Sequence, residues 1–425
     1  MSDPARSFRT GLLLVALVGL AARAGLWLAL GPAADLVHLE PTTIADNMNT
    51  GRGFIYPQYG ADYRAWKEPL YIVLLAGLRR LPDSGEVGIR RFHLALGLGV
   101  AVGTALLAHG LFRDPVRATL AGMLAAVNPF LVYYDTRVAY PLSMDSLLFV
   151  AVALTFLRLI DAPAGGWSGW LTAALVTGVA LWQRATILAA GLAAGAVLFL
   201  DAPRRMRWAV ARRGAVYLVV ALAIVSPWLV RNFQIFGRPL LTTDFPHILF
   251  LGNNPHSNGT FGDQFGQRNI ALASPEFQAK ISRASEIEQY HIFWGEVRRF
   301  VTESPGAYLD LTLRRVVGFF WFTPNAGVDY PPWQRAVYRV SYIVLLLLGG
   351  IGTVLVWRGA ERQGRVRAAV LWASVLGVAA VYALTVINLR HRLPLELVLA
   401  IFAAEPLWRV GRRLRPRPSA GLTRS

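Results

Sequence analysis

The chain has 425 residues, of which 55% are hydrophobic and only 16% are charged, whereas soluble proteins carry about 25% charged residues. Arginine supplies most of the net charge of +18, but no soluble basic domain or aromatic RNA-binding motif accompanies it, which excludes nucleic acid as a partner. The absence of cysteine excludes disulfides and cysteine-ligated metals, and the seven histidines have no ligand-like spacing, so we expect neither a metal nor a cofactor.

Apolar runs of the length that crosses a bilayer, about 20 residues, follow one another along the chain and predict an all-α polytopic membrane protein. The run from Pro69 to Leu78 is too short to span and is predicted to be interfacial or re-entrant. The first run begins like a signal peptide, but its length and the internal Arg23 favour a permanent span. Ten spans are predicted, near residues 11–30, 92–112, 118–132, 145–159, 169–182, 185–200, 215–230, 340–357, 368–387 and 393–408.

Arginine clusters occur in alternate loops between these spans. Because Lys and Arg collect in short cytoplasmic loops, this alternation predicts that both termini are cytoplasmic. The clusters are Arg6 with Arg9, Arg113 with Arg117, residues 204–213, residues 358–367 and the tail at 409–417.

The predicted spans divide the chain into three regions. Residues 1–232 hold spans one to seven with an outer loop at 31–91, residues 233–339 form an extracytoplasmic domain, and residues 340–425 hold spans eight to ten and a basic cytoplasmic tail. In the outer domain, Ser274 before Pro275 and Ser304 before Pro305 are typical of helix starts. We therefore expect that domain to be mainly helical.

Ionisable residues gather at the predicted outer ends of the spans, where burial is costly unless they face a partner or an aqueous cavity. Guanidinium groups bind phosphate through paired hydrogen bonds, so the set predicts one outward phosphate-binding cavity. Interfacial snorkelling is the alternative explanation for any single arginine. The cationic candidates are Lys67, Arg137, Arg184, Arg231, Arg390 and Arg392. Three carboxylates near the same surface, Asp35, Glu40 and Asp145, are candidates for a general base.

Several segments, in order over most of the chain, resemble the bacterial polyprenyl-phosphate-sugar-dependent glycosyltransferases of the GT-C fold. These enzymes are relatives of the protein O-mannosyltransferases and of the aminoarabinose transferase that acts on lipid A. The resembling segments are IADNMNTGRGF with KEPLYIVLL, YPLSMDSLLF, SPWLVRNFQIFGRP with LGNNPHSNG, and INLRHRLPLELVLA. One departure concerns the acid that precedes Ala-x-Asn in many relatives, because its aligned position here is Val37 and Pro41 replaces the Tyr. Glu40 is therefore the first choice of base, Asp35 the second and Asp145 the third.

The resemblance implies a GT-C-like bundle of about ten transmembrane helices in a bacterial inner membrane. It also implies an inverting glycosyltransferase that takes its sugar from a polyprenyl-phosphate donor and gives it to a lipid, glycan or protein acceptor outside the membrane. Cationic side chains would then stabilise the departing lipid phosphate, and the substrate-binding candidates are Asn232, Asn253, Asn254 and His391. A transporter or flippase is the leading alternative, although the chain shows no internal repeat. A non-catalytic assembly subunit is the third possibility.

Overall fold

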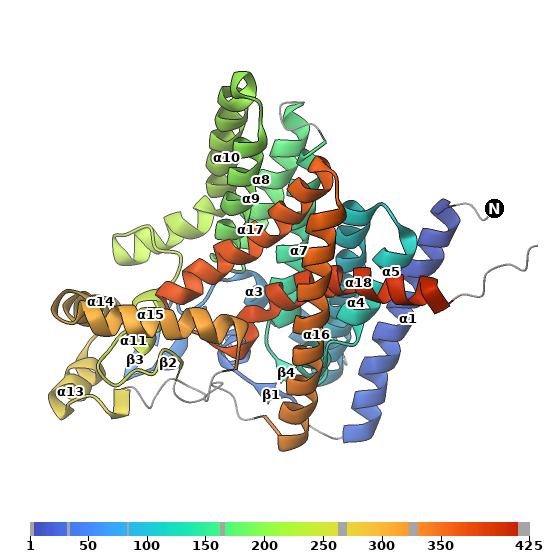
Figure 1. The fold of residues 1–425 in the computed structure, drawn as a ribbon. Coiled ribbons are helices and arrows are strands. Elements are labelled where there is room, and N and C mark those ends of the chain that lie inside the picture. Colours follow the sequence, from blue (N-terminus) through green and yellow to red (C-terminus); the bar gives the residue numbers. More distant parts are fainter. Residues whose placement is uncertain are drawn as a thin grey trace, which may run out of the picture.

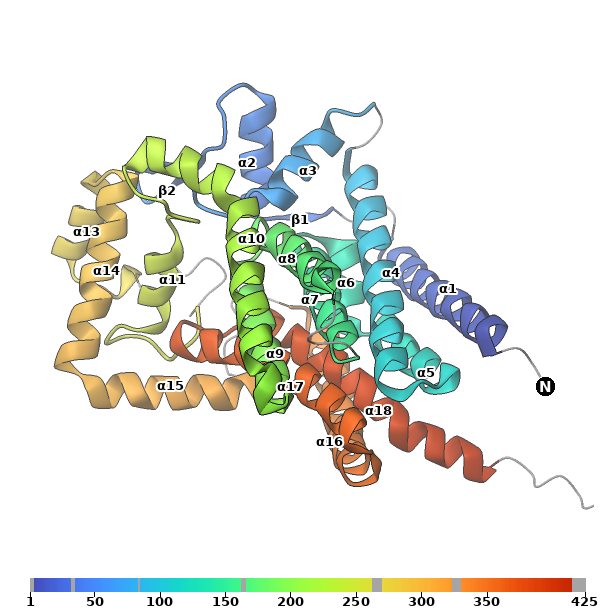
Figure 2. The same cartoon turned by 90° about the horizontal axis from the view of Figure 1, so that it is seen from above.

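The computed structural model describes residues 4–31, 35–82, 85–161, 166–261, 270–322 and 330–414. Long helices form a bundle, and a smaller helical region lies beside one end of it (Figures 1 and 2). In this described part of the chain, six helices are long and apolar enough to cross a membrane. They are α1 (Pro4–Leu30), α4 (Gly85–Phe112), α7 (Leu142–Leu159), α10 (Arg204–Phe236), α16 (Pro332–Gly359) and α17 (Arg362–Leu384).

The predicted third span is broken into two helices, α5 (Pro115–Ala126) and α6 (Pro129–Arg137), which meet at an angle of 49°. The break follows from the sequence at the junction. The side chain of Asn128 accepts hydrogen bonds from the backbone N–H groups of Phe130 and Leu131, and Pro129 occupies the first helical turn. Both features start a new helix rather than continue the old one.

The predicted count of ten spans is not confirmed. The helices α8 (Trp167–Leu181) and α9 (Ile187–Asp201) have 15 residues each. At about 1.5 Å per residue, such helices are shorter than the roughly 30 Å hydrocarbon core. The last helix, α18 (Leu393–Leu414), carries the buried Glu396 and Glu405 and crosses the bundle at a steep angle to α1 and α16 (Figure 1).

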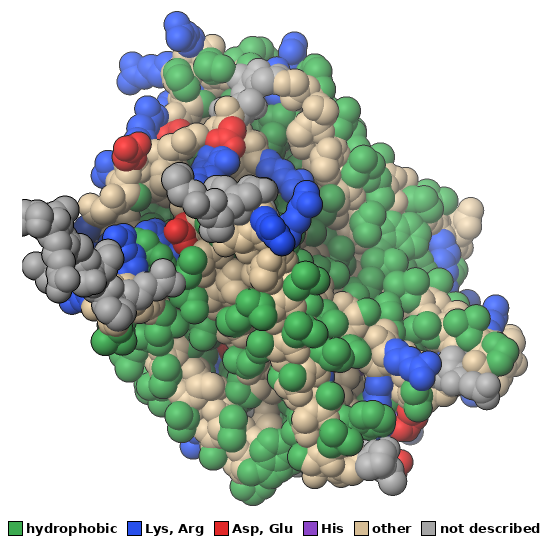
Figure 3. Space-filling model, turned by 90° about the vertical axis from the view of Figure 1, so that its right-hand side faces the viewer, with side chains coloured by type: hydrophobic (Ala, Val, Ile, Leu, Met, Phe, Trp, Pro, Cys, Tyr) green, Lys and Arg blue, Asp and Glu red, His purple; other side chains and the backbone are tan. Residues whose placement is uncertain are grey.

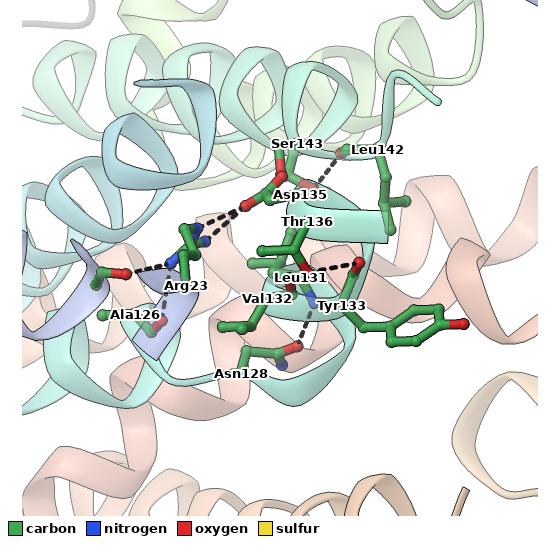
Figure 4. A network of polar contacts seen from close by, with 12 residues as sticks. Arg23, Ala126, Asn128, Leu131, Val132, Tyr133, Asp135, Thr136, Leu142 and Ser143 are labelled. Carbon is green, nitrogen blue, oxygen red and sulfur yellow. Dashed lines mark hydrogen bonds and ion pairs between the residues drawn. The ribbon is translucent and has the colours of Figure 1, made fainter. Parts of the chain in front are cut away.

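A buried ion pair fixes α1 in the bundle. The Arg23 guanidinium on α1 contacts the Asp135 carboxylate on α6 at 2.7 Å and donates to the carbonyl of Ala126 on α5 at 3.1 Å (Figure 4). Ser143 on α7 donates to the same carboxylate at 2.5 Å. A Cβ atom at Gly97 on α4 would collide with both partners of the ion pair. Five helices therefore meet at this charge pair, and loss of Arg23 would leave the buried Asp135 carboxylate without its partner.

The first predicted outer loop contains short strands as well as helices, a correction to the expectation of a purely α-helical chain. Its elements are β1 (Val37–His38), α2 (Glu40–Asn49), β2 (Tyr56–Gln58), β3 (Ala61–Tyr63) and α3 (Leu70–Arg79). Strand β1 pairs in parallel with β4 (Val138–Ala139), which joins α6 to α7, and Val37 lies opposite Val138. This pairing brings the start of α2 beside the α6–α7 connection. The helix α3 has ten residues, too few to span, in keeping with the prediction for this run.

The segment predicted to be an extracytoplasmic domain, residues 233–339, is here called the second outer region and is mainly helical in its described part. Its helices are α11 (Phe245–Gly252), α13 (Pro275–Arg283), α14 (Glu286–Glu303) and α15 (Pro305–Phe320). Ser274 caps α13 as predicted, since its side chain accepts a hydrogen bond from the Phe277 N–H. Pro305 begins α15 as predicted, but the Ser304 side chain makes no capping hydrogen bond. In Figures 1 and 2, α15 lies across the direction of α16.

Arg315 of α15 joins this region to the end of α17. The side chain is fully buried and donates to the carbonyl oxygens of Ala383 at 2.6 Å and Gly252 at 2.5 Å, and to the Asn253 side chain at 3.0 Å. Gly252 has no room for a Cβ atom, because the Thr385 carbonyl lies against it. Three elements are thereby fixed around residues 383–385, just before the 3₁₀ helix η1 (Leu389–Arg392).

The exterior of the bundle is strongly apolar. One face carries hydrophobic side chains over much of its surface, with Lys and Arg gathered mostly toward the upper part (Figure 3). On α1, Leu13, Leu17 and Leu28 are 66%, 61% and 70% exposed. Large exposed apolar surfaces of this kind mark contact with lipid or protein. Together with the long apolar helices, they describe a multi-pass membrane protein.

Candidate functional site

A cavity of about 550 Å³, here called the main cavity, lies between the ends of the long helices and the second outer region. Helices α9, α10, α11 and α17 contribute walls, and η1 and the segment before α3 contribute polar groups. Its ionisable lining residues are Lys67, Glu68, Tyr140, Arg184, Asp244, Tyr290, Tyr382, Arg390 and His391. Segments that are far apart in the sequence thus form one site.

Two of the three cations that line the main cavity have carboxylate partners. The Lys67 ammonium contacts the Asp244 carboxylate at 2.6 Å. Burial lowers the pKa of Lys67, but Asp244 and the nearby Glu40 raise it by a larger amount. The pKa of Lys67 is therefore raised overall, and the amine stays charged. The Arg184 guanidinium contacts the Asp145 carboxylate at 2.5 Å, and Gln183 donates to the other oxygen at 2.7 Å.

Arg390 is the third cation. Among the described residues, no carboxylate forms an ion pair with it, and its buried Nε atom has no hydrogen-bond partner. Its guanidinium lies over the Tyr140 ring at 4.5 Å and over the Phe261 ring at 5.5 Å. Burial lowers the pKa of Arg390, but Tyr140, Tyr134 and Glu40 together raise it by a larger amount, so the pKa of Arg390 is raised overall. The main cavity therefore holds a permanent positive charge at Arg390 that forms no ion pair with a carboxylate of the described residues.

Part of the lining of the main cavity is apolar. Leu188 of α9 and Leu222, Val225 and Leu229 of α10 line it. A cavity with guanidinium and ammonium groups at one end and an aliphatic wall along one side suits an amphiphile with an anionic head. Phosphate fits the cationic end, because guanidinium groups bind its oxygens through paired, charge-assisted hydrogen bonds.

Comparison with known proteins shows which proteins resemble this chain in sequence and in fold. Residues 67–230 match the family model for dolichyl-phosphate-mannose-protein mannosyltransferase. The fold is similar to a crystal structure of the Archaeoglobus fulgidus oligosaccharyltransferase, solved with zinc and sulfate, with a TM-score of 0.52 and 13% identity. The similarity covers 95% of this chain but only 49% of that protein, so the chain spans about half its length. No curated protein sequence matches this chain. The chain has the GT-C fold. The resemblance seen in its sequence segments is confirmed to that extent.

The three candidate bases occupy different environments in this GT-C bundle. Glu40 is half-buried in the first turn of α2, close enough to Lys67 and Arg390 to raise the pKa of both. Asp35 is exposed ahead of β1. Asp145 is engaged by Arg184 and Gln183, which occupy both of its carboxylate oxygens.

Three of the predicted phosphate-binding arginines lie outside the lining of the main cavity. Arg392 is fully buried, donates to the Tyr338 hydroxyl at 2.7 Å and lies 3.6 Å from the Glu396 carboxylate. Arg231 donates to the Arg64 carbonyl at 3.0 Å and stacks on a tryptophan of its own helix, so it attaches α10 to the first outer loop. Arg137 is the last residue of α6, and its buried Nη1 atom has no hydrogen-bond partner among the described residues.

The predicted substrate-binding residues also separate into two groups. His391 lines the main cavity and stacks on Tyr382 with ring centroids 3.9 Å apart. The amides of Asn232, Asn253 and Asn254 instead donate to backbone carbonyls, at 2.7 Å, 2.8 Å and 2.7 Å respectively. These three asparagines hold loops of the GT-C fold together, and none of them lines the main cavity.

Sequence reasoning missed several residues of the main cavity. Asp244 lies in a polar segment with no motif of its own, and only the fold shows that it reaches Lys67. Glu68 is adjacent to Lys67 and accepts from the Ala185 N–H at 3.3 Å, and burial raises its pKa. Tyr140 and Tyr382 supply ring surfaces beside Arg390 and His391. The sequence could have indicated Glu68, because this carboxylate is adjacent in the KEPLY segment to Lys67, a candidate phosphate-binding residue.

Proposed function

We propose that the protein is an inverting glycosyltransferase that uses a polyprenyl-phosphate sugar on the extracytoplasmic face of a bacterial inner membrane, with both termini cytoplasmic. The observation that carries the proposal is the amphiphilic main cavity in a GT-C fold. Its cationic end contains Arg390, whose charge no described carboxylate pairs, and its apolar wall is formed by α9 and α10. A lipid-linked phosphate meets both requirements at once.

In this proposal the donor phosphate lies among Arg390, Arg184 and Lys67. Arg390 makes the direct charge-assisted contact, because the other two cations already hold carboxylates at 2.5 Å and 2.6 Å. As the bond between C1 of the sugar and the phosphate oxygen breaks, negative charge grows on the leaving polyprenyl phosphate. Preorganised cations stabilise such developing charge more than they stabilise the ground state.

Glu40 is the proposed general base. Strand β1 ends two residues before Glu40 and pairs with β4, which is followed by the cavity-lining Tyr140, and this pairing supports a position of Glu40 beside the cationic end of the main cavity. The acceptor hydroxyl gives its proton to the Glu40 carboxylate while the oxygen attacks C1 of the sugar from the side opposite the phosphate. The new C–O bond inverts the anomeric configuration, and the phosphate leaves with the electrons of the old bond. Asp145 is a weaker candidate because Arg184 and Gln183 occupy it, and Asp35 is weaker because it is exposed.

The acceptor is a hydroxyl-bearing lipid, glycan or protein, which reaches C1 from the side of α2 and the second outer region. Neither a metal nor a dissociable cofactor is required by this chemistry, because the phosphate is already the leaving group.

The test is transfer by purified protein in liposomes that contain a polyprenyl-phosphate hexose or pentose with a radiolabelled sugar. The proposal predicts loss of label from the donor, appearance of free polyprenyl phosphate and an inverted glycosidic bond in the product. Arg390→Gln protein is the comparison variant, because the substitution removes the proposed phosphate contact and leaves Arg184 and Lys67 in place. Transfer should be weaker in this variant. Movement of intact donor between leaflets without cleavage would instead identify a flippase and overturn the proposal.

A further inference from the structure

A second cavity, of about 270 Å³, lies near the other end of α18 and takes no part in the proposed transfer. Its Glu405 follows the first residue of α18, Leu393, by 12 positions, or roughly 18 Å of helix. We call it the Arg117 cavity. Its lining includes Arg117, Leu355, Val356, Gly359, Glu405 and Arg409.

The polar side of the Arg117 cavity carries excess positive charge. Glu405 is its only acidic lining residue among those described, and two guanidiniums share that carboxylate. Arg117 contacts one Glu405 oxygen at 2.9 Å, and Arg409 donates to the other at 2.6 Å. Two positive charges against one negative charge leave a net charge of +1. The buried Nε atom of Arg117 has no hydrogen-bond partner among the described residues, so the site has both charge and donor capacity to spare.

The guanidinium of Arg117 is held in place before any ligand arrives. It lies 3.7 Å from the centroid of the Trp408 ring and 5.2 Å from that of Phe112. Arg409 is 44% exposed and can turn toward an incoming anion. A Cβ atom at Gly359 would stand 3.8 Å from an Arg409 nitrogen, an ordinary contact distance, so a side chain longer than that of alanine would reach into the space beside Arg409.

The remaining lining is apolar and leads to the lipid-facing side of α16. Leu355 and Val356 lie in the cavity, and Leu347, Ile351 and Val354 of the same helix are 61%, 52% and 48% exposed. An anion that fits here therefore carries hydrocarbon chains. Basic pockets between membrane helices bind anionic lipid head groups. We propose that the Arg117 cavity binds the phosphate of one anionic phospholipid, whose acyl chains run along α16.

The test uses full-length protein in neutral detergent and counts bound lipid by native mass spectrometry during titration with phosphatidylglycerol or phosphatidylcholine. Arg409→Gln should weaken phosphatidylglycerol binding by about tenfold, the effect of losing one charge-assisted contact. Gly359→Leu, which fills the space and keeps every charge, should weaken it as well. Arg365→Gln is the matched control, because Arg365 is exposed near the same α16–α17 connection and does not line the cavity.

The proposal predicts tight binding of phosphatidylglycerol only, an unchanged affinity in Arg365→Gln, and unchanged sugar transfer in all three variants. Equal losses in Arg409→Gln and Arg365→Gln would show general surface attraction and overturn it. Unchanged affinity in both Arg409→Gln and Gly359→Leu would also overturn it. Competition by inorganic phosphate as effective as by lipid would assign the cavity to a free anion instead.

Discussion

Arg390 and Arg392 are two residues apart, but the structure predicts opposite consequences for their replacement. Arg390 lines the main cavity, and no described carboxylate forms an ion pair with it. Losing one charge-assisted contact to a phosphate costs about 1.5–3 kcal/mol, which corresponds to roughly 10- to 150-fold weaker donor binding. Arg390→Gln should therefore raise the KM for donor by that factor and leave the melting temperature nearly unchanged.

Arg392→Gln should act on stability instead. The Arg392 side chain is fully buried and shares the Tyr338 hydroxyl with Glu396, which also accepts from Asn128 at 2.7 Å. Removing one partner of a buried ion pair typically costs about 3–5 kcal/mol, because the other charge is left uncompensated. That is a large share of a typical total stability of about 5–15 kcal/mol, so protein yield and melting temperature should fall.

The two effects are separated by donor titrations and thermal unfolding measured on the same purified samples. The double variant Arg392→Gln with Glu396→Gln removes both charges and should regain most of the melting temperature lost in the single variant. The reasoning is refuted if Arg392→Gln raises the donor KM without lowering the melting temperature while Arg390→Gln changes neither.

Three further predictions follow from the site and its surroundings. Glu40→Gln should lower kcat by about 10²- to 10⁴-fold with donor binding retained, and near-full activity in that variant together with loss in Asp35→Asn would reassign the base. In Arg315→Lys the amine cannot reach all the oxygens that the guanidinium contacts, so the free energy of unfolding should fall by about 1–3 kcal/mol, measured by thermal unfolding. An unchanged melting temperature would contradict the role of Arg315 in joining α15 and α11 to the end of α17. Burial lowers the pKa of His247 from 6.5 to about 3, so between those pH values the unfolded chain binds a proton that the folded protein does not. Stability relative to His247→Gln should then be complete above pH 6.5 and fall by about 1.4 kcal/mol per pH unit below it, and parallel pH profiles for the two proteins would argue against a buried neutral histidine.

Much of the helical architecture was predictable because apolar runs are local signals. The long spans, the short α3 and the helix starts at Pro275 and Pro305 agree with the sequence predictions. The exact span count was not predictable, because α8 and α9 are apolar but short, and α18 combines apolar residues with buried acids. Hydrophobicity alone does not tell whether protein or lipid surrounds such a helix.

The sequence indicated the cationic chemistry of the candidate site more clearly than it indicated which residues line the main cavity. The cationic character and the positions of Lys67, Arg184 and Arg390 came from the sequence, because ionisable groups at span ends are conspicuous. Arg392 was included for the same reason, although its side chain points into the core toward Glu396. Side-chain direction around η1 depends on how α16, α17 and α18 pack, and no local pattern encodes it. Asp244 was missed because its partner lies 177 positions earlier in the chain.

The most direct test of the account is the position of the phosphate in a structure of the protein bound to a polyprenyl phosphate. The account predicts phosphate oxygens within hydrogen-bond distance of the Arg390 guanidinium, between Arg184 and Lys67, with the first isoprene units against Leu222 and Val225. A phosphate bound instead at Arg231 or Arg137, with the main cavity occupied by neither head group nor chain, would contradict it.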